Sequence, residues 1–506
     1  TGVISMTFLN DLWASFQIFA GNFTDRYGLW VNGALLLLVL AAVGLFLWRS
    51  IRLGRRVRHT QAQLNLPEPS KKQSEEWCRK LSQAVSFPTV TGDKEAMSRF
   101  RDWLKESFPL VFSRLRVLDC PGDGLLFQWR CPEKGEKGPV LLCAHMDVVP
   151  TEGQNWTHPP FEGEIKEETI YGRGALDCKG TLCGILQAVE ELLQDGFVPG
   201  RDVYLAFGCD EETGGKEGAA QIAKQLKMRG LHFDLILDEG TPISIAHLGK
   251  ENFPAALLGV AEKGQATFRL TARQKAGHAA MPPQHTAAGY LSEAICRIEA
   301  APLHKRLLPV MQQCLLFSAP AMGSLQRAMV ANLPFTRPLL FRGTRHNLQL
   351  SALFHSTFAA TCLEGGSAPN VLPETASALL NARILQGDTG EKLLESLRSL
   401  LDDLPVTIEM VSCQDPSAIT DPAGAGYQLV KGAVEETFGR LPCIPTIMPA
   451  GTDTKHYQEF SDHIIRFIPL AVSDATLSAV HGPDEHLSCR SYTAGVIFYE
   501  NLLKKL

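Results

Sequence analysis

The sequence predicts an α/β protein with a main domain on a doubly wound, mainly parallel sheet, an inserted α+β domain, and one transmembrane helix ahead of both. Short apolar runs at 140–143, 203–209 and 233–237 alternate with amphipathic helical patterns, which is typical of strand, helix, strand units. Between 263 and 412 apolar and polar residues alternate instead, as in a half-exposed sheet. The stretch 29–48 carries no charged residue, which indicates a membrane span.

Length and composition narrow the class of protein. The 506 residues are enough for two or three domains, and 45% apolar with 20% charged residues is ordinary for a globular chain. A net charge of −5 gives no reason to expect a nucleic-acid partner. The 13 cysteines are odd in number and show no repeated C-x-x-C spacing, which argues against a disulfide framework or a thiolate zinc site.

The predicted span runs from Leu29 to Trp48. At ~20 residues it can cross a hydrocarbon core of ~30 Å, and a Trp lies near each end as an interfacial anchor. No small-residue cleavage site follows it, which argues against a signal peptide. Residues 1–28 form an amino-terminal segment and 49–75 a basic linker, whose arginines favour a cytoplasmic location for the carboxyl-terminal side.

The main domain covers 76–262 and resumes over 413–506. Its helices are marked by apolar residues at three- and four-residue spacing and its strands by short buried runs. The expected elements are, in order, a helix around 97–104, strand 140–143, a helix over 182–193, strand 203–209, a helix over 219–226, strand 233–237 and a final helix over 492–506.

The inserted domain covers 263–412. Segments 266–272, 377–384 and 406–410 alternate apolar and polar residues, so we expect one face of their sheet to carry helices. The stretch 302–351 is weakly periodic, and its elements are left unassigned.

Imidazole and carboxylate side chains follow three consecutive predicted strands at the edge where open α/β sheets bind ligands. Two His and three carboxylates suit two zinc ions that share a bridging carboxylate, and an adjacent Glu pair can supply one ligand and one base. Alone, the H-x-D motif also fits a capped strand end, and the D-E-E motif also fits a solvated turn. The metal site is favoured because all of these motifs fall at strand ends of one α/β pattern. The side chains are His145 and Asp147, Glu211 and Glu212, Asp238, Asp177 in an intervening loop, and His481 in H-G-P-D-E-H.

Ten short motifs from about Trp77 to the carboxyl terminus give the chain a specific family resemblance. It resembles the co-catalytic zinc peptidases and amidohydrolases that include aminoacylase, acetylornithine deacetylase and glutamate carboxypeptidase. Within them it is most similar to the branch of Gly-X carboxypeptidase and the N-fatty-acyl-amino acid synthase/hydrolase. The motifs are H-M-D-V-V-P, W-T-H-P-P-F, Y-G-R-G-A-L-D, D-E-E-T-G-G, L-D-E-G, A-G-H-A-A-M-P-P, N-V-L-P, N-A-R, G-T-D-T-K-H-Y and H-G-P-D-E.

The resemblance implies a dizinc centre in the main, catalytic domain. Asp177 is expected to bridge two Zn²⁺, with His145 and Asp238 completing one site. Glu212 and His481 are expected to complete the other. His486 follows the same segment, where relatives often have Lys, and leaves open which imidazole is the ligand.

The resemblance also implies roles around the metals. Glu211 is expected to be the general base and Asp147 to orient His145. The inserted domain is expected to be a lid whose His278 helps to bind the oxyanion. Like His486, Cys178 departs from the family pattern, because relatives often have an acid at this position. The peptide bond between Asp177 and Cys178 is expected to be cis. The residues implied at the substrate carboxylate are Arg383, Asn381, Gly451 and Thr452.

The function that follows is a membrane-anchored dizinc hydrolase that cleaves, and reversibly forms, the amide bond of N-acyl amino acids. Two rivals stay open: a carboxypeptidase or dipeptidase for short peptides, and a catalytically silent membrane-tethered binding protein. The expected partners are a small-molecule substrate and the membrane, with monomer or homodimer undecided. The positive-inside rule favours a cytoplasmic catalytic domain, whereas the resemblance favours an extracytoplasmic or lumenal one.

Overall fold

The computed structural model describes residues 28–57, 62–132, 137–250, 253–301 and 304–506. The expected amino-terminal segment lies outside these residues, apart from its last position. The described residues form two compact units, one of residues 28–57 with Met322–Leu340 and one of the remainder.

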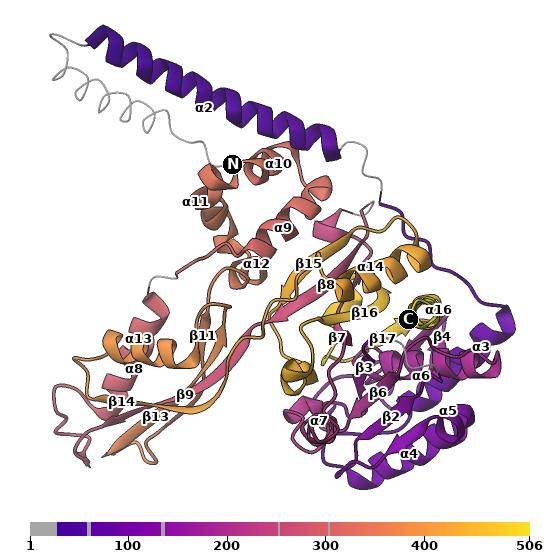
Figure 1. The fold of residues 1–506 in the computed structure, drawn as a ribbon. Helices are drawn as coiled ribbons and strands as arrows, with labels where there is room; N and C mark the ends of the chain where they lie inside the picture. Colours follow the sequence, from indigo (N-terminus) through magenta and orange to yellow (C-terminus); the bar gives the residue numbers. More distant parts are fainter. Residues whose placement is uncertain (1–27, 58–61, 133–136, 251–252, 302–303) are drawn as a thin grey trace. The chain divides into compact units, whose positions relative to one another are not determined.

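The larger unit contains the central sheet of the main domain (Figure 1). Neighbouring strands β6, β3, β7 and β16 are parallel, so their carboxyl ends share one edge, whereas β1, β2 and the β8/β15 pair join with antiparallel contacts. The sheet is therefore mixed, and parallel mainly at its centre. In spatial order its strands are β1 (Arg116–Leu118), β2 (Leu125–Trp129), β6 (Val203–Gly208), β3 (Val140–His145), β7 (Leu235–Ser244), β16 (Ile464–Val472), β8 (Ala255–Glu262) and β15 (Cys443–Met448).

The expected helices of the main domain are present, and local signals fix their ends. Asp93 accepts a hydrogen bond from Ala96 N–H to start the first of them, and a capping box between Ser70 and Gln73 starts an additional helix that precedes it. The expected helices are α4 (Lys94–Ser107), α6 (Lys179–Gln194), α7 (Ala219–Met228) and α16 (Cys489–Lys504). The main domain also contains helices that are not among those expected, namely α3 (Lys71–Val85), α5 (Pro109–Arg114), α14 (Ala425–Phe438) and α15 (Asp474–Ser478).

The inserted region contains a second, antiparallel sheet in the order β11 (Thr357–Gly365), β13 (Thr375–Ile384), β9 (Gly264–Arg273), β14 (Val406–Gln414). Residues of β9 and β13 alternate between buried and more exposed, as the sequence predicts. The buried face packs against α8 (Ala287–Ala300) and α13 (Gly390–Leu400) in one apolar core (Figure 1). The other face of this sheet carries no helix of that core.

The described part of the unassigned stretch 302–351 is mainly helical from Pro309 onward. It forms α9 (Pro309–Ser318), α10 (Ser324–Ala331), α11 (Leu333–Gly343) and α12 (Leu348–Ala352). Of these, α10 and most of α11 belong to the smaller unit, together with α2 (Gly28–Val57), which continues the predicted span through the first arginines of the linker.

Two small sheets complete the fold near the expected site residues. β10 (Gly277–His278) pairs with β12 (Val371–Leu372) in the inserted region. β17 (His486–Ser488) pairs with β5 (Thr169–Tyr171), which also pairs with β4 (Ile165–Lys166). The second of these sheets brings the late H-G-P-D-E-H segment beside the loop that precedes Asp177.

Candidate metal centre and active site

His145, the last residue of β3, is buried at the carboxyl edge of the central sheet, with 1% of its surface exposed. Its Nδ1 lies 3.0 Å from the backbone oxygen of Asp147 and 3.4 Å from the Asp147 carboxylate. Its Nε2 lies 3.0 Å from Asp177 Oδ1. A ring held through one nitrogen and facing a carboxylate with the other has the arrangement of a metal-ligating imidazole.

The Asp147 carboxylate joins two loops of the site. It accepts hydrogen bonds from Glu211 N–H at 3.1 Å, Glu212 N–H at 3.2 Å and Thr91 Oγ1 at 2.7 Å. Burial alone would raise the pKa of Asp147, but the hydrogen bonds from His145 and Thr91 outweigh it and lower the pKa. Asp147 therefore stays ionised and fixes the turn that carries the Glu pair.

Asp177 lies between the two predicted imidazole ligands. Its Oδ1 is 3.0 Å from His145 Nε2, and its Oδ2 is 3.2 Å from His481 Nε2. His481 Nε2 is also 3.3 Å from Glu212 Oε2. Hydrogen bonding to Asp177 and Glu212 raises the pKa of His481 to about 10, which reflects the negative field that a bound cation would neutralise.

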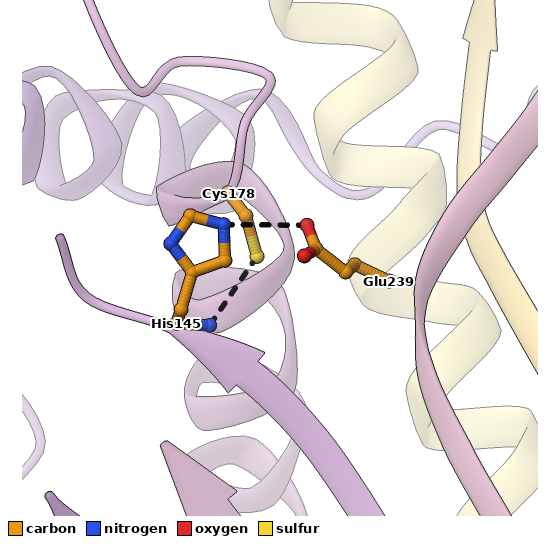
Figure 2. A group of neighbouring side chains, drawn as sticks. All are labelled: His145, Cys178 and Glu239. Atoms are coloured by element: carbon orange, nitrogen blue, oxygen red, sulfur yellow. Dashed lines mark hydrogen bonds and ion pairs between the residues drawn. The ribbon is translucent and has the colours of Figure 1, made fainter. Parts of the chain in front are cut away.

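The peptide bond between Asp177 and Cys178 is cis, as expected. The Cys178 side chain accepts a hydrogen bond from the His145 backbone N–H at 3.5 Å (Figure 2). Figure 2 also shows Glu239 reaching the same imidazole, with its Oε2 3.4 Å from His145 Nε2. The side chains whose ligand atoms converge are His145, Asp177 and Glu212 in one group and His145, Cys178 and Glu239 in another.

Asp238 belongs to neither of these groups. It lies in β7 where the pairing with β16 slips between Arg466 and Phe467, so the strand continues past the expected end at Leu237. Its Oδ1 accepts the Glu239 N–H at 2.9 Å, while its Oδ2 is buried without a hydrogen-bond partner in the described structure. Burial and the Glu239 charge raise the pKa of Asp238 to about 7. Its role as a zinc ligand stays a prediction.

The donor set fits divalent zinc. Imidazole and carboxylate are zinc ligands in catalytic sites. Besides Asp238 Oδ2, the buried Glu212 Oε1 has no hydrogen-bond partner in the described structure, so two carboxylate oxygens are available for a cation.

Glu211 precedes Glu212, the carboxylate that lies beside His481. The Glu211 backbone N–H donates a hydrogen bond to Asp147, which fixes its position. Burial, followed by the charge of Glu239, raises the pKa of Glu211 to about 10. A carboxyl with so strongly perturbed a pKa beside a candidate metal site is a good candidate for proton transfer.

His486 makes other contacts. Its Nε2 lies 3.1 Å from Thr476 Oγ1 and its Nδ1 lies 2.8 Å from the Asp484 backbone oxygen. The geometry therefore favours His481 over His486 at the cluster.

Glu485, to which the sequence motifs assign no role of its own, connects the two halves of the centre. Its fully buried carboxylate accepts hydrogen bonds from Arg173 Nη1 at 2.6 Å, Leu176 N–H at 2.8 Å and Asp177 N–H at 3.0 Å. Since Glu485 lies four residues after His481, this network ties the Asp177 loop to the His481 segment. Nothing in the sequence distinguishes Glu485 or Glu239 from a surface carboxylate. Each lies beside another acidic residue within a motif, and neither has the spacing of a metal ligand.

The expected substrate residues lie in two places. Asn381 and Arg383 lie on β13 on the face opposite the helix-covered core, since alternate residues share one face of a strand. The Arg383 guanidinium forms no hydrogen bond or ion pair within the described part of the chain. His278 is exposed on β10, where its Nδ1 accepts the Ala280 N–H at 3.0 Å. No hydrogen bond or ion pair between described residues joins His278 or Arg383 to the carboxylate cluster.

Gly451 and Thr452 follow β15. Thr452 is buried and donates through Oγ1 to Glu262 Oε1 at 2.6 Å, and Glu262 also lies 3.0 Å from Arg466. Gly451 has open space where a side chain would be. The Thr452 hydroxyl is therefore committed to the protein, and Gly451 leaves room for a ligand.

Comparisons with known proteins identify the family of the chain. The family model "Peptidase family M20/M25/M40" matches residues 141–505. The chain is 34% identical over 454 residues to the N-fatty-acyl-amino acid synthase/hydrolase PM20D1.1 of Danio rerio, covering 87% of each. It is 33% identical over 448 residues to a probable carboxypeptidase S-like 2 of Dictyostelium discoideum, covering 85% of each.

A solved structure shares the fold. The M20 family metallo-carboxypeptidase Sso-CP2 from Sulfolobus solfataricus superposes with a TM-score of 0.63 at 18% identity, over 85% of this chain and 98% of that one. The sequence motifs, the cluster at the sheet edge, the family match and this fold agree, and the chain belongs to peptidase family M20/M25/M40, a family of metal-dependent hydrolases.

Proposed function

We propose that the chain is a membrane-anchored dizinc hydrolase that cleaves the amide bond of N-acyl amino acids and recognises their free carboxylate. By microscopic reversibility the same site forms that bond from a fatty acid and an amino acid. The observation that carries the proposal is the position of Asp177, whose two carboxylate oxygens each face a different imidazole. A single-metal site would need only one such oxygen.

The residues that would hold the metals are His145, Asp177 and Asp238 for one ion and Asp177, Glu212 and His481 for the other. Bound zinc ions would supply Lewis acidity, which makes a water nucleophilic near neutral pH and stabilises the oxyanion of the tetrahedral intermediate. Glu239, close to His145, would then lie beside the first ion.

Glu211 performs the proton transfers in this proposal. Its carboxylate accepts a proton from the attacking water and delivers it to the leaving nitrogen of the amide. The charge of Glu239 helps to keep Glu211 protonated, so positive charge at the cluster would return its pKa toward the ordinary value. Asp147 contributes by holding the backbone of the Glu pair and the ring of His145.

Substrate recognition is assigned to the inserted domain acting as a lid. Arg383 has an uncommitted guanidinium, and a planar guanidinium suits bidentate binding of a carboxylate. Burial lowers the pKa of Arg383 and that of neighbouring Lys263 without removing the guanidinium charge. With Arg383 on the carboxylate, Asn381 and Gly451 would border the amino-acid part and His278 the oxyanion.

The membrane anchor is α2. The candidate span within it, Ala34–Val57, has 24 residues, and its most apolar window has a mean hydropathy of 2.3 and no buried residue. The uncharged part of α2, Leu29–Trp48, is about 30 Å long at a rise of about 1.5 Å per residue, which matches the hydrocarbon thickness of a bilayer. Exposed leucines along it are the surface that lipid would cover.

The second candidate is a carboxypeptidase or dipeptidase, which the carboxypeptidase S-like relative favours. Both candidates use the same metals and base, so the substrate separates them. The test is hydrolysis by the purified full chain of N-acyl amino acids, the same amides with a methylated carboxylate, and dipeptides.

We expect N-acyl amino acids to be cleaved fastest and their methyl esters poorly. Preferential cleavage of dipeptides would support the second candidate. No turnover of any amide by zinc-loaded protein would indicate a binding protein on this fold.

A further inference from the structure

The helices α10 and α11 form one compact unit with α2, although almost three hundred residues separate them in sequence. The Asn332 side chain donates from Nδ2 to the Phe46 backbone oxygen at 3.2 Å and to Ser50 Oγ at 3.0 Å. The Arg49 guanidinium lies 6.0 Å from the centre of the Phe335 ring. Asn332 itself is completely buried, so polar and packing contacts both define this association.

These contacts fall at one level of the predicted span. Phe46 belongs to the apolar run that ends at Trp48, whereas Arg49 and Ser50 begin the arginine-rich flank. With a rise of about 1.5 Å per residue, Phe46 to Ser50 occupy about 6 Å of helix. The two helices therefore meet α2 where its apolar surface gives way to charge, the level of a membrane interface.

The helix pair also exposes several large apolar side chains. Leu325, Phe335 and Leu339 are 76%, 60% and 56% exposed, and Pro338 is exposed beside them. Phe335, Pro338 and Leu339 have the i, i+3, i+4 spacing of one helix face. Val330 and Leu333 are buried instead, so the pair has a packed side and an exposed apolar side.

The surrounding sequence is strongly one-sided in charge. From Ala300 to Leu363 there is no Asp or Glu, while there are five Arg and one Lys. Arg327 and Arg337 lie within the helix pair, and Arg337 is exposed next to the apolar stripe. An apolar helix face bordered by arginine, without carboxylates, is the pattern of a helix that lies in the interface of an anionic bilayer.

We propose that Met322–Leu340 is a second membrane-contacting element, which inserts Leu325, Phe335 and Leu339 into the bilayer interface beside the arginine-rich end of α2. The inference rests on the proposed anchoring by α2. A lipid surface is favoured over a second copy of the chain because the apolar stripe adjoins a helix that is itself exposed to lipid and because no carboxylate is available to pair with the arginines across a symmetric interface.

This element links the membrane to the second sheet along the chain. In the sequence, Met322–Leu340 lies between α8 and β11, two elements of the inserted domain. The proposed lid is thus tethered to the bilayer through the middle of its own sequence, where amphiphilic N-acyl amino acids would partition.

The test places a photo-crosslinking amino acid, benzoyl-phenylalanine, in the full chain reconstituted in phosphatidylcholine and phosphatidylserine vesicles. Single sites are Phe335 and Leu339, with Leu38 of α2 as the reference for the span and Met228 as an exposed apolar control. Leu38 is 67% and Met228 78% exposed, so each position accepts the probe without repacking. Mass spectrometry identifies the adducts.

We expect phospholipid adducts at positions 335, 339 and 38 and none at 228. A lipid adduct at 38 without one at 335 or 339 would overturn this inference and leave the anchor intact. Adducts at 335 only to a second copy of the chain would overturn it in favour of self-association. Absence of lipid adducts at 38 as well would overturn both the inference and the proposed anchor.

Discussion

Replacing Glu485 by Gln tests whether a buried acid holds the two halves of the centre together. The carboxylate of Glu485 is fully buried and pairs with Arg173, which is 1% exposed, at 2.6 Å. Its other partners are the backbone N–H groups of Gly174, Leu176 and Asp177. Gln keeps one oxygen for two of these donors but turns an amide NH₂ toward the others, leaving the buried guanidinium without its counter-charge.

Removing one partner of a buried ion pair costs about 3–5 kcal/mol. The matched control is Glu459→Gln, since Glu459 pairs with Lys227 at 2.8 Å but both side chains are more than half exposed. An exposed pair contributes at most about 1 kcal/mol. The free energy of unfolding is measured from urea transitions of the metal-free full chain in detergent, followed by near-ultraviolet circular dichroism.

The double variant Arg173→Met with Glu485→Met completes the experiment, because removing both charges avoids the unpaired cation. We expect it to be more stable than Glu485→Gln. If Glu485→Gln and Glu459→Gln lowered the free energy of unfolding equally, Glu485 would not be the link between the Asp177 loop and the His481 segment.

Three further predictions concern the base, the carboxylate site and a buried lysine. Glu211→Gln should retain zinc, measured by mass spectrometry, and lose about 10²–10⁴-fold in turnover, since the amide cannot accept a proton; loss of zinc would make Glu211 a ligand instead. Arg383→Ala should lower kcat/KM for N-acyl amino acids but not for N-acyl amines, with Arg269→Ala on the same sheet face as control; equal losses on both substrates would make Arg383 structural. Burial lowers the pKa of Lys263 from 10.5 to about 8, so the unfolded chain binds this proton more tightly and stability should rise with pH across that window. Urea midpoints should show this slope in the native protein and a weaker one in Lys263→Met; an unchanged slope would contradict the assignment.

The sequence predicts the parts of the fold that local pattern controls. Helix stripes such as that of α6 and buried runs such as that of β3 depend on residues near one another, and they appear where expected. The mixed character of the sheet could not be predicted, because the direction of β8 beside β16 depends on how the chain returns from a distant segment. The continuation of β7 past Asp238 depends likewise on its pairing with β16.

The candidate site shows the same division. Strand ends that meet at one edge predicted that His145 and Glu212 would lie close together, whereas grouping Asp177 and His481 with them depended on the family resemblance. Glu239 and Glu485 were missed, since their importance comes from burial against partners that are remote in sequence. The association of α10 with α2 was also unpredictable, because a weakly periodic stretch gives no sign of which distant helix it contacts.

The most direct test of the central claim is the zinc content per chain of three purified proteins, measured by inductively coupled plasma mass spectrometry. The native chain should bind two zinc ions, His486→Ala should still bind two, and His481→Ala should retain one, because His481, unlike His486, faces both Asp177 and Glu212. A single zinc in the native chain, or loss of zinc in His486→Ala with full zinc in His481→Ala, would contradict a dizinc centre built around Asp177.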